Sequence, residues 1–399
     1  MALPRYKSFL GIAKNGKTAT VTAATGSGSA ITYTATNTFA AGNIVTVTGL
    51  TTTTGVSLNI ANAVIATASG SQFTVASTLV GTAVATQTGK AALQGVDSKT
   101  DPSDYIPVKE IAPFDNIKYL DDESWRGSMV HTYGTVQGNI HAEFQFGGDV
   151  YPDTFGYPVA GVLGDYAVTG SNPYVHTMAV LNSGTGQATS YTLTDFNALN
   201  ARQFSGCQFG GLDVKFNADG LLEYTAMAQG FASATMATTP SPSYSAVTNV
   251  PVWTGVTTIG GNVTAKLSEG NINITRPLDA IFTVDGSQNP YQIFQGAVSV
   301  DGSLKLIFED DTDLNRYLTN TQPSLDINFS TGSGASQLAV QFTMTKCAFQ
   351  VAKIDRSKDY VELDVTYKAI ANTTDVGASA GYSPIKVVLK NAKTTAVYA

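Results

Sequence analysis

The sequence predicts an all-β protein, and three observations support this. Apolar and polar residues alternate with a period of two in many segments, whereas no segment of a dozen residues keeps the apolar spacing of a helix. Charged residues make up 13% of the 399-residue chain, which is about half the usual share. Glycine, threonine, serine and alanine fill the difference, as is typical of β-rich proteins with hydroxyl-rich surfaces.

Strands are expected wherever this alternation runs between turn residues. Turn signals stand at 217–220 (Asn-Ala-Asp-Gly) and at Asp301-Gly302. One or two short helices are expected, at about Asp153 to Leu163 and Thr312 to Leu318. The alternating segments are NIVTVTGL, IHAEFQF, LDVKFNADGLLEYTAMA, VSVDGSLKLIF, SLDINFS, LAVQFTM and YVELDVTY.

Charge divides the chain into two parts of different composition. Residues 1–96 contain five basic residues and no acid, so their net charge is +5. Residues 97–399 contain 18 basic and 30 acidic residues, so their net charge is -12. This division predicts that two differently composed pieces have been joined.

Residues 15–94 are predicted to form a small β-sandwich. Thr and Val alternate there, with Gly-Ser turns at intervals of roughly ten residues. The alternative is a disordered Thr/Ser/Gly linker, in which recurring apolar positions would serve no purpose. These positions are Val45, Val47, Leu50, Val56, Leu58, Ile60, Val64, Ile65, Phe73, Val75 and Val80.

The second part of the chain contains an internal repeat. Residues 207–230 align with 347–369 and place Cys207 opposite Cys347. Upstream, VQGNIHAEFQF resembles FQGAVSVDGSLKLIF, and YIPVKEI resembles NVPVWTG. The segment 234–249 is then the linker between two copies. Chance similarity between alternating strands is the alternative interpretation.

No catalytic or metal-binding constellation is evident. The histidines His131, His141 and His176 lack metal-ligand spacing, and no CxxC, HExxH or GxSxG motif occurs. The segment DDTDLN matches the first three ligand positions of a helical calcium loop, but Arg316 and Gln322 stand where Gly and Glu are required. We therefore expect no enzyme activity, no cofactor and no metal.

The chain start and the cysteine content indicate a cytoplasmic site of synthesis. The first residues lack the continuous apolar core of a signal peptide, and no run of 18 apolar residues occurs. Two cysteines in so long a chain argue against a disulfide framework. The net charge of -7 argues against nucleic-acid binding that depends on Lys and Arg.

Four segments carry a family resemblance in their order and spacing: FLGIAK, YIPVKEI with KYLDDESWRGS, VQGNIHAEFQF and YPDTFGYPVAGVLGD. Together they resemble the tail tube proteins of long-tailed bacteriophages, over roughly residues 1–14 and 95–399. Similar proteins connect the first two segments by a short loop, so we interpret 15–94 as an inserted immunoglobulin-like decoration domain. The resemblance implies two tandem tube domains of β-sandwich or half-barrel type. The first comprises an arm and first strand at 1–14 together with 95–240, and the second comprises 241–399.

The resemblance also implies a structural function in the virion. Tube domains join edge to edge into rings, which stack into a conduit for double-stranded DNA, and ring closure removes exposed strand edges. A chain with two tube domains needs three copies for a six-domain ring, so a homotrimeric, pseudo-hexameric ring is favoured over a homohexamer. The implied partners are the tape-measure, tail terminator and distal tail proteins, with assembly in the host cytoplasm.

One face of the NIHAEFQF segment is apolar and the other is polar. We assign the polar face to the lumen, where an acidic or hydroxyl-rich wall would keep phosphates from sticking, within a Debye length of about 8 Å. The alternative is that this face meets the outer solvent. With the matching positions of the repeat, the predicted lumen-lining residues are Asn139, His141, Glu143, Gln145, Ser299, Asp301, Ser303 and Lys305.

The segment LDDESWRGS matches the long loop that reaches the neighbouring ring in similar proteins. Trp and Arg are enriched at binding hot spots. The alternative is a buried aromatic with a local ion pair. The predicted inter-ring contacts are Pro4, Arg5, Tyr6, Phe9, Asp121, Asp122, Glu123, Trp125 and Arg126.

The second functional hypothesis is a host-surface-binding adhesin or tail-fibre-like protein. It predicts exposed aromatic residues in the inserted domain, which contains only Tyr33, Phe39 and Phe73. Weak binding of the insert to a host cell surface is compatible with either hypothesis.

Overall fold

The computed structural model describes residues 4–398 except 16–17, 38, 40, 95–98, 237, 285 and 394–396. Strands hold 53% of the chain and helices 6%, so the predicted all-β class is confirmed. The helices α1 (Gly156–Leu163) and α2 (Thr312–Leu318) lie where the sequence places them. None of the described helices is long and apolar enough to span a membrane.

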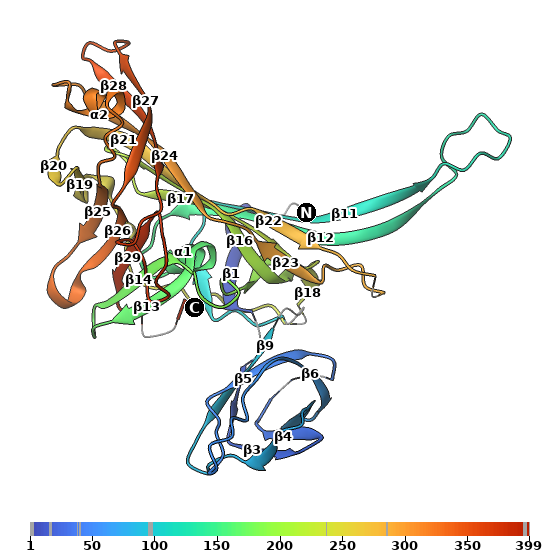
Figure 1. Ribbon diagram of the computed structural model, residues 1–399. Helices are drawn as coiled ribbons and strands as arrows, with labels where there is room; N and C mark the ends of the chain where they lie inside the picture. Colours follow the sequence, from blue (N-terminus) through green and yellow to red (C-terminus); the bar gives the residue numbers. More distant parts are fainter. Residues whose placement is uncertain are drawn as a thin grey trace.

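The large sheet contains eight strands in one unbroken antiparallel order, β11-β12-β17-β16-β21-β24-β28-β27 (Figure 1). We call the first four strands the N-terminal half-sheet and the last four the C-terminal half-sheet. The half-sheets meet where β16 pairs with β21. The bounds are β11 Glu110–Asp122, β12 Gly134–Asp149, β16 Ala201–Asn217, β17 Glu223–Gly230, β21 Leu267–Thr275, β24 Ser299–Ile307, β27 Cys347–Asp355 and β28 Glu362–Ala369.

Both half-sheets have the same strand arrangement. Each begins with a hairpin, which is β11 with β12 or β21 with β24. In the second pair, the strand that comes later in the sequence (β17 or β28) lies next to the hairpin, and the earlier strand (β16 or β27) lies beyond it. A β-bulge follows Phe209 in β16 and Phe349 in β27, and the buried Cys207 and Cys347 precede them at the same distance. Each residue of one half-sheet can therefore be matched to a residue of the other.

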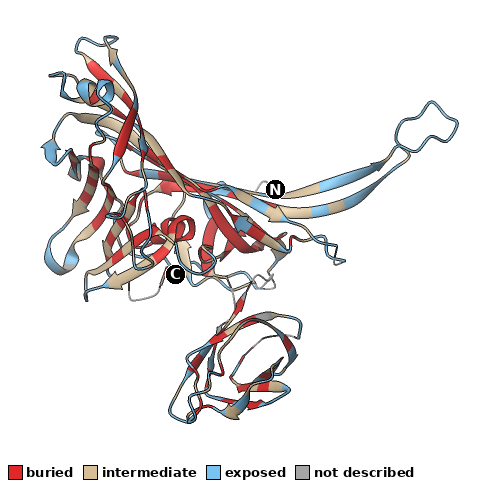
Figure 2. Ribbon diagram, in the orientation of Figure 1, coloured by how far each residue is buried: buried red, intermediate tan, exposed pale blue. Residues whose placement is uncertain are grey.

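A second layer covers one side of the large sheet. Under the C-terminal half-sheet it contains the order β13-β14-β29-β26-β25-β19-β20, and under the N-terminal half-sheet β10, β1, β15 and the first half of β16. Aromatic and aliphatic residues of both layers form one core. Figure 2 shows buried residues in both layers. The bounds are β1 Phe9–Lys14, β10 Asp104–Ile106, β13 Gly164–Thr169, β14 Tyr174–Val180, β15 Tyr191–Phe196, β18 Ala234–Thr235, β19 Gly255–Ile259, β20 Asn262–Thr264, β22 Leu278–Ile281, β23 Gln292–Gln295, β25 Leu325–Thr331, β26 Leu338–Met344 and β29 Lys386–Asn391.

Residues 18–94 form a separate small β unit of eight strands, ordered β2-β9-β5-β6-β7-β4-β3-β8, with a hydrophobic core of its own. Tyr33, Phe39 and Phe73 pack against one another inside it, with ring centroids 5.0 and 5.2 Å apart, so the unit presents none of them on its surface. The bounds are β2 Thr18–Val21, β3 Ala23–Ser27, β4 Ala30–Thr34, β5 Ile44–Thr48, β6 Ile60–Ala68, β7 Gln72–Ala76, β8 Val80–Thr82 and β9 Gly89–Gln94.

The small β unit occupies the position of a hairpin turn. It lies in the chain between β1 and β10, which pair directly with Leu10 opposite Ile106. In the C-terminal part of the chain, β19 and β20 form the corresponding hairpin through the two residues Gly260-Gly261. A short turn can carry a large insertion without disturbing the paired strands, because closure entropy grows slowly with loop length.

The Asn-Ala-Asp-Gly turn at 217–220 joins β16 to β17 as predicted, but the predicted turn at Asp301-Gly302 is wrong. Both residues lie inside β24. A Cβ atom at Gly302 would lie 2.2 Å from the Asn271 carbonyl oxygen and 2.6 Å from Tyr367 Oη. The glycine therefore admits a buried tyrosine into the layer, and the turn signal of the dipeptide is overridden by packing.

Candidate functional site

The face of the large sheet opposite the second layer is polar. Successive side chains of a strand point to opposite faces, so the residues between the buried ones face away from the core. Side chains on this polar face form rows across neighbouring strands, because directly opposite residues share a face. One row contains Asp149, Glu223, Lys215, Asn271, Ser303 and Thr366, and the next contains Thr225, Asp213, Asn273, Asp301 and Lys368.

The structure brings the predicted lumen residues of β12 and β24 together on this polar face. Glu143, Gln145 and Ser303 are exposed there, whereas Ser299, Asp301 and Lys305 are half-buried. The ring of His141 lies 6.3 Å from the ring of Phe282. Asn139 lies beside the face, where the pairing of β11 with β12 shifts register.

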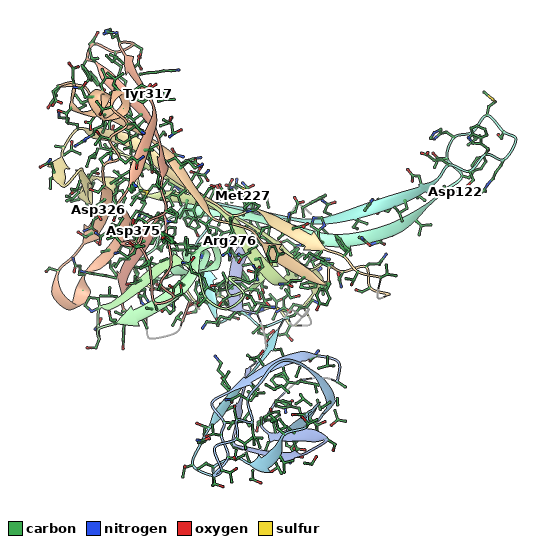
Figure 3. The ribbon with its side chains drawn as sticks, viewed as in Figure 1. Asp122, Met227, Arg276, Tyr317, Asp326 and Asp375 are labelled. Carbon is green, nitrogen blue, oxygen red and sulfur yellow. The ribbon has the colours of Figure 1, made fainter. Side chains whose placement is uncertain are left out.

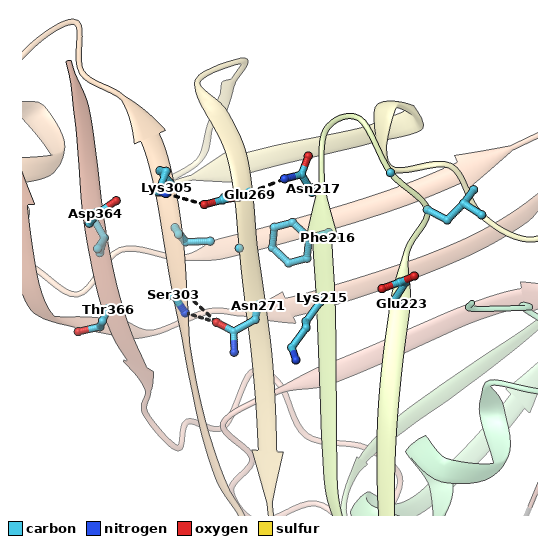
Figure 4. A pocket seen from close by; sticks show the side chains of 15 residues that line it. Lys215, Phe216, Asn217, Glu223, Glu269, Asn271, Ser303, Lys305, Asp364 and Thr366 are labelled. Carbon is cyan, nitrogen blue, oxygen red and sulfur yellow. Dashed lines mark hydrogen bonds and ion pairs between the residues drawn. The ribbon is translucent and has the colours of Figure 1, made fainter. Parts of the chain in front are cut away.

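The lysines at the junction of the half-sheets have acidic partners, and Figure 4 shows the pair of Lys305 with Glu269. Lys305 Nζ lies 2.6 Å from Glu269 Oε1, and Lys215 Nζ lies 3.1 Å from Asp213 Oδ2. The hydrogen bond from Lys305 lowers the pKa of Glu269. Lys215, Glu269 and Lys305 border a groove of about 670 Å³ that crosses the junction. The paired cations leave the groove little attraction for phosphate.

The strands β11 and β27 form the two edges of the large sheet. Among the described strands, β11 pairs with β12 alone and β27 with β28 alone. The Phe114 side chain of β11 is 59% exposed, although it belongs to a sheet with a buried core. Unpaired edges of this length are sites for pairing with another chain.

The hairpin of β11 and β12 extends far beyond the body of the molecule (Figure 1). Trp125, at its tip, is 100% exposed, so the alternative of a buried tryptophan is wrong. Arg126 forms a local ion pair with Asp122 and lies 4.6 Å above the Tyr133 ring. Five further exposed apolar residues of this hairpin were not singled out from the sequence: Tyr119, Leu120, Met129, Val130 and Val136.

The N-terminal candidates separate into two groups. Pro4, Arg5 and Tyr6 are exposed, and Arg5 Nη2 donates a hydrogen bond of 2.6 Å to the Lys109 carbonyl. Phe9 is only 5% exposed, and its ring stacks on Phe196 with centroids 4.7 Å apart. Phe9 is therefore a core residue, and its assignment as an inter-ring contact is corrected.

The comparison with protein families decides the identity. The model of the family described as phage tail tube protein matches residues 115–369, from within β11 to the end of β28. The chain belongs to the phage tail tube protein family. The comparison with curated proteins gives no match. The small β unit lies outside the matched residues.

The matched region of this tail tube protein contains the contacts that join its half-sheets. Arg276, which is 4% exposed, lies at the junction (Figure 3) and donates hydrogen bonds to the carbonyls of Gly296 (2.9 Å), Val162 (3.0 Å) and Gly186. Val162 belongs to the last turn of α1, where backbone carbonyls favour a cation. No group of three or more His, Cys, Asp or Glu side chains among the described residues is arranged to hold a metal ion.

A second joint of the tail tube protein surrounds the buried His176 of β14. Its Nδ1 lies 2.7 Å from Tyr166 Oη, and its Nε2 lies 2.9 Å from Asn391 Oδ1 at the end of β29. The Asn391 amide donates to the Pro152 carbonyl (2.6 Å). Because Asn391 Oδ1 is an acceptor, the imidazole carries its proton on Nε2 and accepts the Tyr166 hydroxyl at Nδ1. The neutral imidazole therefore suits this site.

We expect the tail tube protein to lose stability as pH falls below about 6.5, in part through His176. Burial lowers the pKa of His176, so below its ordinary value of 6.5 the unfolded chain binds a proton that the folded chain refuses. The expected loss is at most about 1.4 kcal/mol per pH unit, and none arises above pH 7.5. Denaturant unfolding at pH 8.0 and 5.5 measures this loss. It should shrink in His176→Gln, and an unchanged pH dependence in this variant would contradict the assignment.

Proposed function

We propose that this protein is the ring-forming subunit of the tail tube, and that double-stranded DNA passes along the polar face of its large sheet. One observation carries the proposal: two matching half-sheets already join edge to edge inside one chain, at β16 and β21. The free edges of the same sheet, β27 and β11, match β16 and β21. The joint that exists within the chain can therefore recur between chains.

The register of the joint between chains follows from the joint within the chain. Within the chain, Asp213 stands opposite Asn273. Lys353 matches Asp213 and Phe114 matches Asn273, so Lys353 of one chain should stand opposite Phe114 of the next. In the same way Val351 falls opposite Asn116, and Asp355 opposite Ala112. Pairing in this register removes both exposed edges of every chain. Three chains supply six half-sheets, which favours a homotrimeric, pseudo-hexameric ring.

The position of the small β unit supports the assignment of the polar face to the lumen. It lies on the side of the molecule away from the polar face (Figure 1). In a closed ring, a bulky unit of 77 residues (18–94) fits on the outer surface, where it would be a decoration domain exposed to solvent. The polar face then points inward, with its paired lysines and its Asn, Ser and Thr side chains around the passage. The tape-measure protein would occupy this passage before the DNA.

The exposed hairpin tip supports ring stacking. Trp125 and Met129 lie beyond the edge of the body, where they are free to meet another ring. Large exposed apolar side chains at the end of an arm mark an interaction site. We assign the residues Asp121–Arg126 and the exposed arm Pro4–Tyr6 to contacts between rings.

Electron microscopy of the purified protein at high concentration tests the proposed function. We expect hollow tubes whose rings show six inner densities and three outer knobs. Six knobs per ring would indicate a homohexamer. Isolated or fibre-like particles at every concentration would contradict the tube assignment and favour the adhesin hypothesis.

Removal of the small β unit should leave assembly intact. We expect a variant in which Asn-Gly replaces residues 15–101 to keep the pairing of β1 with β10, because β19 and β20 need only two linking residues. Its unfolding midpoint should stay within a few degrees of the parent midpoint, and its tubes should lack knobs. Loss of folding would show that the unit is part of the tube body.

A further inference from the structure

The two half-sheets carry hairpin arms of matching length, but only one arm is docked. In the C-terminal half-sheet the arm consists of β22 and β23, which continue β21 and β24 after a break at Arg276-Pro277. In the N-terminal half-sheet the arm is the outer part of β11 and β12. Its register shifts between Ile117 and Tyr119, and Ile117 matches Arg276. Both arms therefore have an irregularity at the same place.

The docked arm is fixed on the N-terminal half-sheet through Gln295, which is 1% exposed. Its Nε2 donates to the carbonyls of Gly161 and Phe209, both at 2.9 Å, and its Oε1 accepts the Ala188 amide at 2.9 Å. At the tip, the Gln288 carbonyl accepts the amide of Ile140 (2.9 Å). The docked arm continues β21, and β21 pairs with β16 of the N-terminal half-sheet. The arm thus lies on the neighbouring half-sheet, not on its own.

The free arm has the same anchor residue without a partner surface. Gln137 matches Gln295, as the aligned VQG and FQG segments show, and it is exposed. The surface that would receive it is also uncovered. All eight residues of α1, which the docked arm contacts, are buried, whereas α2 has no buried residue. Tyr317 and Leu318 at the end of α2 are 36% and 65% exposed.

We propose that in the ring the base of the free arm of one chain, around Tyr119 and Gln137, lies on α2 and β27 of the neighbouring chain. The Gln137 amide donates to the carbonyl of Phe349, which matches Phe209. The Tyr119 side chain, which matches Leu278, faces the exposed end of α2. This contact rests on the proposed function, because it follows from the pairing of β27 with β11. It lies within a ring and leaves the tip at Trp125 free for the next ring.

One difference separates the two docking surfaces. A Cβ atom at Gly210 would lie 2.6 Å from Leu278 Cγ, so the docked arm needs a glycine there. Gln350 occupies the matching place in β27. Tyr119 therefore lies further from β27 than Leu278 lies from β16, and the arm between chains contacts the end of α2 more than β27.

The Gln137→Ala variant tests whether the free arm docks on the neighbouring chain. We expect its monomer to melt with the parent protein, because the side chain is exposed, and its critical concentration for ring assembly to rise at least tenfold. The control is Gln72→Ala, which removes an exposed glutamine from the small β unit and should assemble like the parent. Light scattering and electron microscopy measure both.

A crosslink locates the contact. In the double variant Gln137→Cys, Gln350→Cys, which also lacks the Gln137 amide and is therefore assembled above its own raised critical concentration, a short bifunctional thiol reagent should join chains in the rings. The native Cys207 and Cys347 are buried, and burial raises the pKa of each thiol to about 12, so they stay unreactive. Rings of the double variant that do not crosslink, together with normal assembly of Gln137→Ala, would overturn the docking of the free arm and leave the tube function standing. Absence of rings from the parent protein would overturn both.

Discussion

The Arg276→Met variant is expected to be less stable than the parent protein by about 3 kcal/mol, because it leaves one buried and two partly buried carbonyl groups without this donor. The guanidinium bonds to Gly296 within the C-terminal half-sheet and to Val162 and Gly186 of the N-terminal part. We expect these bonds to hold the angle between the half-sheets, because they tie the end of β21 to α1 and to the segment before β15. We also expect the variant to assemble poorly, since the curvature of the ring depends on that angle.

Lys215→Met is the matched control for Arg276→Met. Lys215 lies on the adjacent strand β16, its side chain is 64% exposed, and its ion pair with Asp213 faces solvent. Exposed pairs of this kind contribute about 0–1 kcal/mol. Denaturant unfolding measures both variants. Equal losses in the two would show that Arg276 has no special role at the junction.

The Ala352→Pro variant is expected to fold and to remain monomeric. The backbone amide of Arg276 donates to the Gly210 carbonyl, and the backbone amide of Ala218 donates to the Ser268 carbonyl. The even-numbered residues of β16 therefore point their backbone amide and carbonyl groups toward β21. Ala352 matches one of them, Leu212, and its amide therefore points away from β28 toward the open edge. Proline is tolerated at such an edge position but removes the donor that the neighbouring chain requires.

Sedimentation at concentrations where the parent forms rings checks this prediction. Ala352→Ser keeps the backbone donor and should assemble normally. Circular dichroism must show the parent fold in both variants. Rings formed by a folded Ala352→Pro protein would exclude β27 as the edge that joins chains.

The edge strand β11 already contains a proline. Pro113 matches Ile272, whose amide points toward β16 in the joint within the chain. The joint between chains therefore has one hydrogen bond fewer than the joint within the chain. Prolines on exposed edges also limit uncontrolled pairing. The two joints of the ring should thus differ in strength, and the weaker one is made during assembly.

Local patterns predicted several of the strands and both helices. Period-2 alternation located β12, β24 and β28, and apart from Asn139 the polar residues grouped in β12 and β24 share one face. The aligned cysteines at 207 and 347 led to the matching bulges, which fix the register of both half-sheets. A face is a local property of a strand, so the sequence alone can specify it.

Features that depend on long-range packing were not predictable in this way. Asp301-Gly302 has the composition of a turn, but Tyr367 from β28 requires the glycine inside a strand. Phe9 follows an exposed N-terminal arm, and its burial depends on Phe196 of β15, whose ring stacks on it. Gln137 and Gln295 are identical in type and local sequence, and only the fold shows that one is docked and the other exposed.

Disulfide trapping of the edge joint tests the central claim most directly. Phe114→Cys and Lys353→Cys fall opposite each other in the proposed register as a non-hydrogen-bonded pair, whose Cα atoms lie about 4.5 Å apart, a separation that a disulfide can span. The account predicts that oxidised rings run as covalent trimers in denaturing gels. Phe114→Cys with Asp355→Cys, which is displaced by two residues and so about 7–8 Å apart, should not crosslink. Monomers alone from the first pair, or equal crosslinking of both pairs, would contradict a ring closed between β27 and β11.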